Sequence, residues 1–444
     1  MEKPLARRFR LDYFQIMVLS FAVLILVGAF LLMLPISSAT GKVTPFTDAV
    51  FTATTSACVT GLVVQDTGTY WSTFGHVIIL ILVQIGGLGV VTMAASFAMV
   101  AGRKIGLLQR STMQASISAP KLGGVVRLTR FILLFTLLIE CLGAILLAPT
   151  MIRDFGVGKG LWYALFHSVS AFCNAGIDLM GVREPFSSLT AYVGNPLVNI
   201  VVMALIVFGG LGFLTWDDIC THGIHLRHYR MQSKVVLVTT ALLTLIPAVG
   251  FFLLEFSDMP LGQRVCASLF QAVTPRTAGF NTVNLAEMSE AGHLTYILLM
   301  LIGGSPGSTA GGMKTTTFAV LLACAVAIFR KRDSVHFFGR RVAQDVISTA
   351  ATLALMYAGL CVGGAMLICR VEGLPMLTCL YETASALGTV GCSLGITPTL
   401  STFSRWVLIA FMYIGRVGGL TLIYAALDGK KQMGKLPLDR ITVG

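Results

Sequence analysis

Charged residues are scarce in this chain. Asp, Glu, Lys and Arg make up 12% of the 444 residues and hydrophobic residues make up 55%, whereas soluble domains are about 25% charged. This composition excludes an ordinary soluble fold and predicts a membrane protein. Apolar stretches of about 20 residues, the length that crosses a bilayer, recur along the chain. We expect spans near 14–35, 76–100, 128–149, 196–215, 235–254, 294–329 (interrupted), 346–369 and 404–427.

Motifs of redox, metal and acid–base chemistry are also lacking. The ten cysteines form no CxxC pair and no metal-ligand spacing, and most lie in apolar segments, where a thiol behaves as a small hydrophobe. No pair of carboxylates is arranged for acid–base catalysis. The apolar run from Phe14 to Leu34 is too long for a signal peptide and ends without a small-x-small cleavage site, so we expect a retained first span.

Basic residues outnumber acidic ones by twelve, but they are unevenly distributed. Five segments hold 22 of the 32 Lys and Arg residues: 3–10, 103–130, 227–234, 330–341 and 430–440. An excess of Lys and Arg marks the cytoplasmic side. We therefore expect a multi-pass protein of the cytoplasmic (inner) membrane with both termini cytoplasmic. The charges serve topology and contact with membrane lipids, and no nucleic-acid partner is expected.

A short apolar segment that ends in small residues and a glycine occurs four times. The glycines are Gly61, Gly176, Gly279 and Gly391, spaced 115, 103 and 112 residues apart. An aromatic residue stands ten positions before the glycine in three segments and nine before it in the third. A second glycine cluster follows within each next span, near residues 86, 209, 303 and 415. A period near 110 residues exceeds that of solenoid repeats and indicates a duplicated membrane unit.

The predicted fold is therefore an all-α membrane protein of four membrane-pore-membrane repeats. Eight spans and four re-entrant pore helices would surround one central pore. We assign the repeats to residues 1–126, 127–234, 235–345 and 346–444. The second span of the third repeat is the broken sixth span.

Irregular backbone at membrane depth is tolerated only where it is buried in protein or lines water. Four such hairpins can converge so that their backbone carbonyls replace the hydration shell of an alkali cation. Glycine permits the backbone conformations with positive φ that this arrangement needs. The alternative for any single glycine is close helix packing. The candidate filter residues are Val59, Thr60, Gly61, Asn174, Ala175, Gly176, Thr277, Ala278, Gly279, Thr389, Val390 and Gly391.

The sixth span is interrupted by residues 303–312, which contain five glycines and a proline. Glycine costs a helix about 1 kcal/mol and proline about 3 kcal/mol relative to alanine, so the helix must break and line a cavity. Residues 303–307 also fit the GxSxG nucleophile pattern, and residues 307–315 approach a phosphate loop. Both motifs need a preceding strand, which this segment lacks.

The filter segments, above all 54–61 and 274–281, resemble those of the Ktr/Trk/HKT superfamily of potassium transporters, and the chain as a whole resembles its KtrB-type subunits. The resemblance implies potassium uptake through a homodimer, with possible sodium stimulation and no cofactor in this chain. Glycine at all four filter positions goes with potassium selectivity in this superfamily. The third segment is one residue shorter, so its carbonyl register stays open.

The resemblance also implies that the broken span is an intramembrane gating loop below the filter. We assign the gate to Gly303, Gly304, Ser305, Pro306, Gly307, Ser308, Thr309, Ala310, Gly311, Gly312, Lys314 and Arg416. An intramembrane arginine usually faces a cavity or an acidic partner. Arg416 is thus either an electrostatic barrier beside the loop or a structural charge that reaches the cytoplasm. Arg276 is expected to hold the third filter segment in place by hydrogen bonds to carbonyls. Glu140 and Lys314 have no evident partner.

No cytoplasmic segment is long enough for a folded domain of about 50 residues. A gate nevertheless needs an input, and the resemblance implies a separate cytoplasmic ring of nucleotide-binding, KtrA-like subunits. His222, His225 and His228 are spaced by three, but their basic linker suggests solvated residues rather than a zinc site. An intramembrane enzyme and a membrane scaffold are the competing functions.

Overall fold

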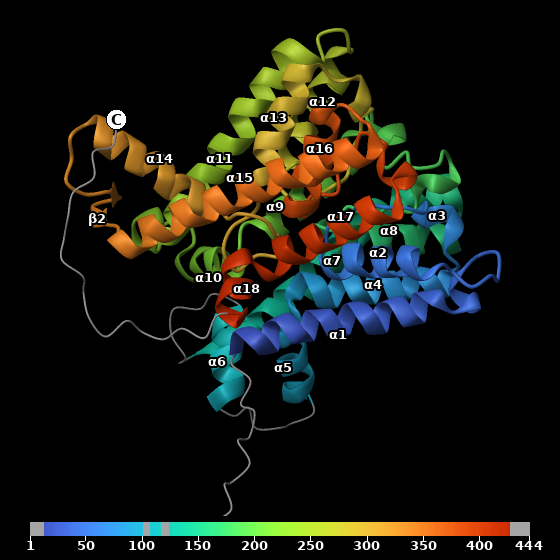
Figure 1. Cartoon of the computed structure of the whole chain (residues 1–444), viewed down its shortest axis with the longest axis horizontal. Coiled ribbons are helices and arrows are strands. Elements are labelled where there is room, and N and C mark those ends of the chain that lie inside the picture. The colour runs from blue at the N-terminus through green and yellow to red at the C-terminus, as the bar shows by residue number, and fades with distance from the viewer. Residues whose placement is uncertain (1–12, 101–106, 117–123, 427–444) are drawn as a thin grey trace, which may run out of the picture.

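The computed structural model describes residues 13–100, 107–116 and 124–426 (Figure 1). Within these residues the only strands form a two-residue antiparallel hairpin, β1 (His336–Phe337) and β2 (Arg340–Arg341). The basic segments at 3–10 and 430–440, and part of 103–130, lie outside the described residues. The rest of the described chain is helical or looped, as expected of an all-α protein.

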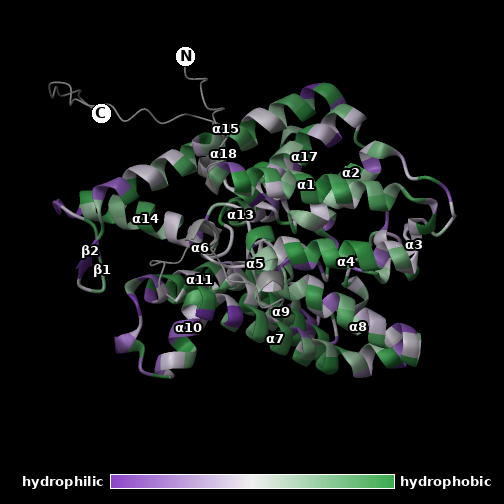
Figure 2. Ribbon diagram, turned by 90° about the horizontal axis from the view of Figure 1, so that it is seen from below, coloured by the Kyte–Doolittle hydropathy of each residue, from purple (hydrophilic) through white to green (hydrophobic). Residues whose placement is uncertain are grey.

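Among the described residues, four helices are long and apolar enough to cross a membrane alone. They are α1 (Tyr13–Met33), α7 (Val125–Phe155), α11 (Met231–Gly250, continued by a π-helical turn at Phe251–Glu255) and α15 (Gln344–Glu372). Each corresponds to the first span of one expected repeat. Hydrophobic residues cover the sides of the helices, while hydrophilic residues gather at the two ends of the molecule, around α10 and β1–β2 at one end and α3 and α8 at the other (Figure 2).

A short helix follows each long one. These are α2 (Phe46–Ala57), α8 (Val157–Phe172), α12 (Leu261–Val273) and α16 (Met376–Gly388). At 1.5 Å per residue their 12 to 16 residues reach only about 18 to 24 Å, less than the roughly 30 Å of a bilayer core. The aromatic residues that mark the four segments, Phe51, Phe166, Phe270 and Tyr381, are fully buried. They anchor the short helices in the core.

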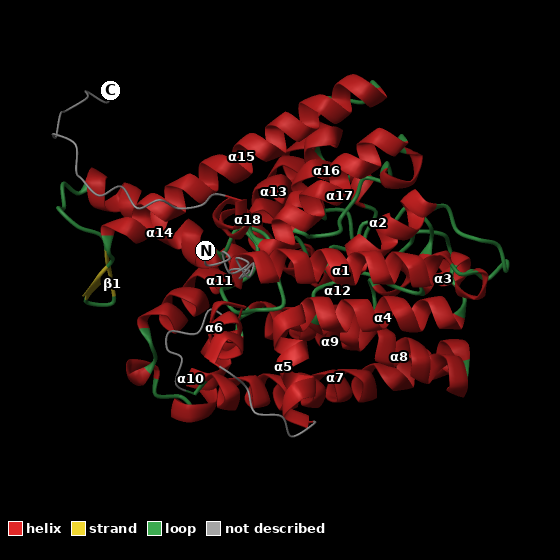
Figure 3. Cartoon of the chain, turned by 60° about the horizontal axis from the view of Figure 1, so that its bottom comes forward, coloured by secondary structure: helices red, strands yellow, loops and turns green. Residues whose placement is uncertain are grey.

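A helix of 12 to 16 residues follows the short helix of each repeat: α4 (Thr73–Leu88), α9 (Pro196–Gly210), α13 (Glu290–Leu301) and α17 (Thr402–Val417). A further helix then follows each of these: α5 (Val90–Val100), α10 (Phe213–His222), α14 (Thr315–Phe329) and α18 (Gly419–Ala426). Figures 1 and 3 show α1, α2 and α4 side by side, in agreement with their contacts.

The spans expected near 76–100 and 196–215 are bent in the structure, which the sequence did not indicate. The chain bends by 97° between α4 and α5 and by 99° between α9 and α10. The cause is a glycine at each junction, since Gly89 and Gly212 have φ of 86° and 87° and Gly418, between α17 and α18, has φ of 91°. Such a φ is incompatible with an α-helix. In the described part of the chain, four helices are long and apolar enough to be spans alone, or up to six if each bent pair counts as one span. The expected number of eight spans therefore stays a prediction.

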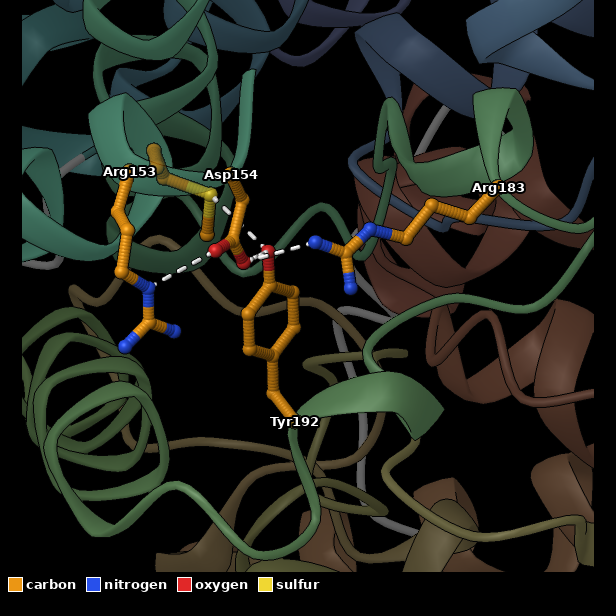
Figure 4. A network of polar contacts seen from close by, with 5 residues as sticks. Arg153, Asp154, Arg183 and Tyr192 are labelled. Carbon is orange, nitrogen blue, oxygen red and sulfur yellow. Dashed lines mark hydrogen bonds and ion pairs between the residues drawn. The ribbon is translucent and has the colours of Figure 1, made fainter. Parts of the chain in front are cut away.

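The remaining elements are short. They comprise α3 (Thr67–Tyr70), α6 (Leu107–Ser116) and 3-10 turns at Pro35–Ser37, Met180–Val182, Thr190–Tyr192, Leu226–His228, Leu285–Glu287 and Thr397–Thr399. A polar cluster fastens the loop after α8 to the end of α7 (Figure 4). Asp154 accepts hydrogen bonds from Arg153 (3.1 Å), Arg183 (2.7 Å) and the Tyr192 hydroxyl (2.9 Å). The loop therefore holds a defined position beside the four glycine segments.

Candidate functional site: a ring of four glycine segments

The four glycine segments share one backbone conformation. The glycines have φ of 99° (Gly61), 63° (Gly176), 85° (Gly279) and 93° (Gly391). The residue two positions earlier also has positive φ in every segment: Val59, Asn174, Thr277 and Thr389. The residue between these two positions does not have a positive φ in any of the four segments. Backbone that alternates between positive and negative φ can turn successive carbonyls toward the same side, whereas an extended strand points them alternately to opposite sides.

Positive φ is a strained conformation for β-branched residues such as Val59, Thr277 and Thr389, and it persists only where the surroundings impose it. Buried hydroxyls at the ends of the short helices supply part of this constraint. The amide of Gly61 donates to Thr55 Oγ1 (2.9 Å), and the amide of Gly391 donates to Ser385 Oγ (3.0 Å). The equivalent hydroxyl of the second segment, Ser170, bonds the amide and carbonyl of Ile177.

The third segment accommodates its missing residue before the loop begins. Its hydroxyl, Thr274, stands five residues before the glycine instead of six and donates to the carbonyl of Phe280 (2.5 Å). The amide of Ala278 bonds a carbonyl four residues earlier, whereas the equivalent amides of the other segments reach back five residues. Thr277 and Gly279 nevertheless keep the shared φ pattern. The register that the sequence left open is thus the same in all four segments.

The four glycines form a closed ring. A Cβ built on each glycine would lie less than 3.0 Å from a carbonyl oxygen of the next segment, a separation that real Cβ atoms essentially never show. Gly61 meets Ala175, Gly176 meets Ala278, Gly279 meets Val390, and Gly391 meets Thr60. The segments therefore follow one another around an axis in chain order, and the fourth closes on the first. Any side chain at these positions would push the carbonyls apart or turn them away.

A hollow of about 410 Å³ lies on one side of the ring. It is lined by the four glycines and by residues that follow them, including Asp66 and Asp178. Asp178 lies in the loop after the second segment, outside the spanning helices. Burial raises the pKa of the Asp178 carboxyl to about 7, with a further contribution from neighbouring Asp66. Asp66 accepts hydrogen bonds from the amides of Thr69 and Phe186.

The loop of residues 302–314 contacts the opposite side of the ring. A Cβ at Gly311 would meet the side chain of Thr389, and one at Gly303 would lie 3.2 Å from Thr277 Cγ2. Both partners precede the filter glycine in their segments, whereas the hollow is lined by residues that follow it. The loop and the hollow thus occupy the two faces of the ring.

The helix breaks expose the carbonyls that hold this loop. A helix leaves its last four carbonyls without intrahelical partners. At the end of α9, the Gly209 carbonyl accepts from the amide of Thr309 (3.2 Å) and the Gly210 carbonyl accepts from the amide of Ser305 (2.9 Å). At the end of α17, the Gly415 carbonyl accepts from the amide of Gly312 (3.2 Å). The second glycine clusters therefore bind the loop as well as ending the helices.

Arg416 lies between the loop and the first repeat. Its guanidinium donates to the carbonyls of Thr309, Gly86 and Gly87, the last at 2.8 Å. The structure thus places Arg416 beside the loop rather than directed away from it. Lys314, which the sequence left without a partner, donates to the Ala310 carbonyl at 2.7 Å and caps its own loop.

Two other buried charges also have partners. Arg276 donates to the Thr240 carbonyl and the Thr244 hydroxyl, both at 3.2 Å, and so fastens the third segment to α11. Glu140, expected without a partner, accepts from Gln84 Nε2 at 3.2 Å and lies 3.8 Å from Cys173 Sγ. Cys173 stands three residues before Gly176, so Glu140 lies directly behind the second segment.

The sequence interpretation missed one set of residues. The residue after each buried aromatic is polar, and in three segments it bonds the chain that leaves the ring. His167 accepts from the amide of Leu179 (3.3 Å), Gln271 donates to Thr282 Oγ1 (3.2 Å), and Glu382 accepts from Ser393 (3.2 Å). An imidazole, amide or carboxyl side chain directly after the aromatic residue was the signal that could have identified these three residues.

Comparisons with known proteins agree with this architecture. The model of the TrkH family, described as cation transport proteins, matches residues 3–432. The potassium/sodium uptake protein NtpJ of Enterococcus hirae is 39% identical, with 95% of this chain and 94% of that protein covered. The Ktr system potassium uptake protein B of Bacillus subtilis is 38% identical, with 97% of this chain and 96% of that protein covered. The Ktr system potassium uptake protein B of Vibrio alginolyticus is 34% identical, with 97% of this chain and 94% of that protein covered.

The crystal structure of the potassium transporter TrkH from Vibrio parahaemolyticus superimposes with a TM-score of 0.73 over 96% of this chain and 87% of that one, at 20% identity, which shows a shared fold. The resemblance inferred from the glycine segments is confirmed. The intramembrane-enzyme interpretation is wrong, because the matched family consists of transporters. The chain belongs to the TrkH family of cation transport proteins.

Proposed function

We propose that this protein takes up potassium through the ring of four glycine segments, which acts as its selectivity filter. The observation that carries the proposal is ring closure, with each glycine against a carbonyl of the next segment. Aligned carbonyls can replace the water around a dehydrated alkali cation. The relatives named potassium or potassium/sodium uptake proteins support this substrate, with sodium as a second ion or activator. No cofactor enters the proposal.

The four short helices support a cation as the permeating species. Each short helix ends within four residues of the start of its filter residues, and this holds for α2, α8, α12 and α16. A helix C-terminus carries about half a negative charge. Four such ends around one axis favour a cation at the ring, and Asp66 and Asp178 add negative charge in the hollow.

The 302–314 loop serves in this proposal as the gate. It contacts the face of the ring opposite the hollow, and amide–carbonyl hydrogen bonds of 2.9 to 3.2 Å hold it to the ends of α9 and α17. Arg416 places a positive charge against the loop and repels a permeating cation. Opening requires the loop to leave the carbonyls of Gly209, Gly210 and Gly415, which can then bind water.

The remaining elements of the proposal concern assembly and orientation. The repeats end near residues 126, 234 and 345, and both termini and the β1–β2 end lie in the cytoplasm of an inner-membrane protein. We propose a homodimer that binds a ring of nucleotide-binding, KtrA-like subunits at this end. The relatives named as components of Ktr systems support such assembly.

Tracer uptake in a cell that lacks its own potassium uptake systems tests the function. Expression of this chain, alone and with a candidate ring subunit, should restore growth at low external potassium and drive rubidium uptake. Normal membrane insertion without any cation flux in either arrangement would favour a scaffold role. Flux of sodium but not rubidium would instead show that the ring does not select potassium.

A further inference from the structure

A groove of about 460 Å³ runs between α11 and α14, away from the ring. Its walls are almost entirely apolar and come from both helices. The walls include Val238, Leu242 and Ile246 of α11 and Phe318, Leu322, Ala323 and Val326 of α14. Several are strongly exposed, with Leu242 at 50%, Ile246 at 67% and Leu322 at 54%. In a bilayer such a hollow is filled by hydrocarbon unless protein covers it.

The depth of the groove matches one leaflet. Eight residues separate Val238 from Ile246 on α11, and eight separate Phe318 from Val326 on α14. At 1.5 Å per residue each wall is about 12 Å long, close to half of a hydrocarbon core of roughly 30 Å. The groove is therefore long enough to hold most of one acyl chain lying along the helices.

One end of the groove is basic and polar. Arg332, Ser334 and His336, which follow α14, line this rim. The segment 330–341 holds five Lys and Arg residues and one acid, Asp333. Asp333 lines a smaller neighbouring hollow together with Arg332 and Arg341. Among the described residues no carboxylate forms an ion pair with Arg332, so its guanidinium is available to an external anion.

We propose that this groove binds an anionic phospholipid of the cytoplasmic leaflet, with one acyl chain between α11 and α14 and the headgroup phosphate at Arg332, Ser334 and His336. This inference rests on the proposed orientation of the protein. Acidic headgroups attract basic residues at a membrane surface, and an apolar groove below them fits the attached chain. A second copy of the protein related by a twofold axis would instead place two basic rims against each other, where their like charges repel.

The lipid would act on transport through α14. This helix begins at Thr315, directly after the 302–314 loop, and Lys314 at its N-cap bonds the loop carbonyls. An acyl chain of the lipid packed along α14 favours the position of this helix in the present structure, in which the 302–314 loop is bound to α9 and α17. Occupancy of the groove therefore stabilises the closed loop, and loss of the lipid should raise basal flux.

Lipid retention can be measured without reference to transport. The detergent-purified protein is mixed with phosphatidylglycerol, and retained molecules are counted by native mass spectrometry. Arg332→Gln should weaken retention about fivefold, the effect of one basic residue near a headgroup. Ala323→Phe, which fills the groove from a half-buried position, should abolish it. Arg330→Gln, an exposed charge that does not line the groove, and Leu355→Phe on α15 are the matched controls.

Retention unchanged by both Arg332→Gln and Ala323→Phe would overturn the proposal. Equal retention of phosphatidylcholine and phosphatidylglycerol would overturn the assignment to an anionic headgroup. Disulfide cross-linking between two copies through Leu242→Cys and Leu322→Cys in native membranes would show that a second copy covers the groove. Because retention does not depend on flux, a filter that fails to select potassium leaves this test intact.

Discussion

Arg416 and Gly87 lie 329 residues apart in the chain and are joined by a 2.8 Å hydrogen bond from the guanidinium to the carbonyl. The same guanidinium donates to Thr309 in the loop. One side chain thus connects the last repeat, the first repeat and the candidate gate, so its removal tests whether the loop is held closed.

Arg416→Ala should raise rubidium flux about tenfold. The variant removes both the charge beside the pathway and hydrogen bonds from a charged donor, each worth about 1.5–3 kcal/mol, and about 1.4 kcal/mol corresponds to tenfold. Initial uptake rates in proteoliposomes measure the effect. Arg416→Lys keeps the positive charge, and its rubidium flux should lie between that of Arg416→Ala and that of the wild type. Loss of uptake at normal expression would instead assign Arg416 a structural role.

Gly61→Ser should admit sodium and reduce the potassium preference roughly tenfold. A Cβ there would lie 2.6 Å from the Ala175 oxygen, which would displace one carbonyl of the ring. Competition between rubidium and sodium in tracer uptake measures the preference. Gly391→Ser should behave similarly, because its Cβ would meet Thr60 across the same ring.

Gly158→Ser provides the matched control for these filter variants. Gly158 lies at the start of α8 and has open space around its Cβ position. Its substitution should leave ion preference unaltered. If Gly61→Ser also left the preference unaltered, the ring would not be the selectivity filter.

Deletion of residues 307–311 should raise maximal flux and leave ion preference nearly unchanged. The deletion removes the Thr309 amide that bonds α9 and the Gly311 backbone that lies against Thr389, while the four glycine segments keep their own contacts. Maximal rate and rubidium-to-sodium preference are measured in the same vesicles. A properly inserted deletion variant with wild-type rates would show that this loop does not limit flux.

Uptake should fall as external pH is lowered from 8 to 6. The pKa of Asp178 is raised to about 7 by burial, so its carboxylate is mostly ionised at pH 8 and mostly neutral at pH 6. The negative charge concentrates cations in the hollow, an effect that can reach about tenfold. Rubidium uptake at subsaturating concentration measures the pH profile.

Asp178→Asn should show the low rate at both pH values. The contribution of Asp178 to folding stability changes with pH in the opposite direction from uptake. The reason is that the pKa of Asp178 in the folded protein lies above its unfolded value of about 3.9. The Asp178 contribution to stability is present below pH 4 and is lost as the pH rises through about 7. Thermal unfolding of the two proteins across this range checks the sign. A variant with the wild-type uptake profile would exclude Asp178 as the titrating group.

Reversing the charges of Arg340 and Arg341 should weaken binding of the cytoplasmic ring subunits, and the difference from the wild type should shrink at high salt. Both side chains are exposed on β2, and exposed charge pairs are screened by salt. Co-purification from native membranes measures assembly. The same change at Lys430 and Lys431, which lie outside the described residues, extends the test to the tail. A chain that purifies without a companion and transports fully would leave lipid contact as the role of these charges.

The sequence by itself determined the class of protein and the positions of the four glycine segments. Low charge and repeated apolar runs require a membrane environment. Glycine at 61, 176, 279 and 391, each after an aromatic and small residues, indicated where irregular backbone had to occur. Glycine and proline at 303–312 predicted the interrupted helix, because their cost to a helix is local and large.

Only the tertiary structure decided how these segments meet. Hydropathy continues through Gly89 and Gly212, so the sequence could not distinguish a packed glycine from a bend, which depends on φ. The order of the ring, the equal register of the shorter third segment and the loop's bonds to Gly209 and Gly415 join residues far apart in the chain. Such contacts depend on the simultaneous packing of all four repeats, which no local propensity encodes.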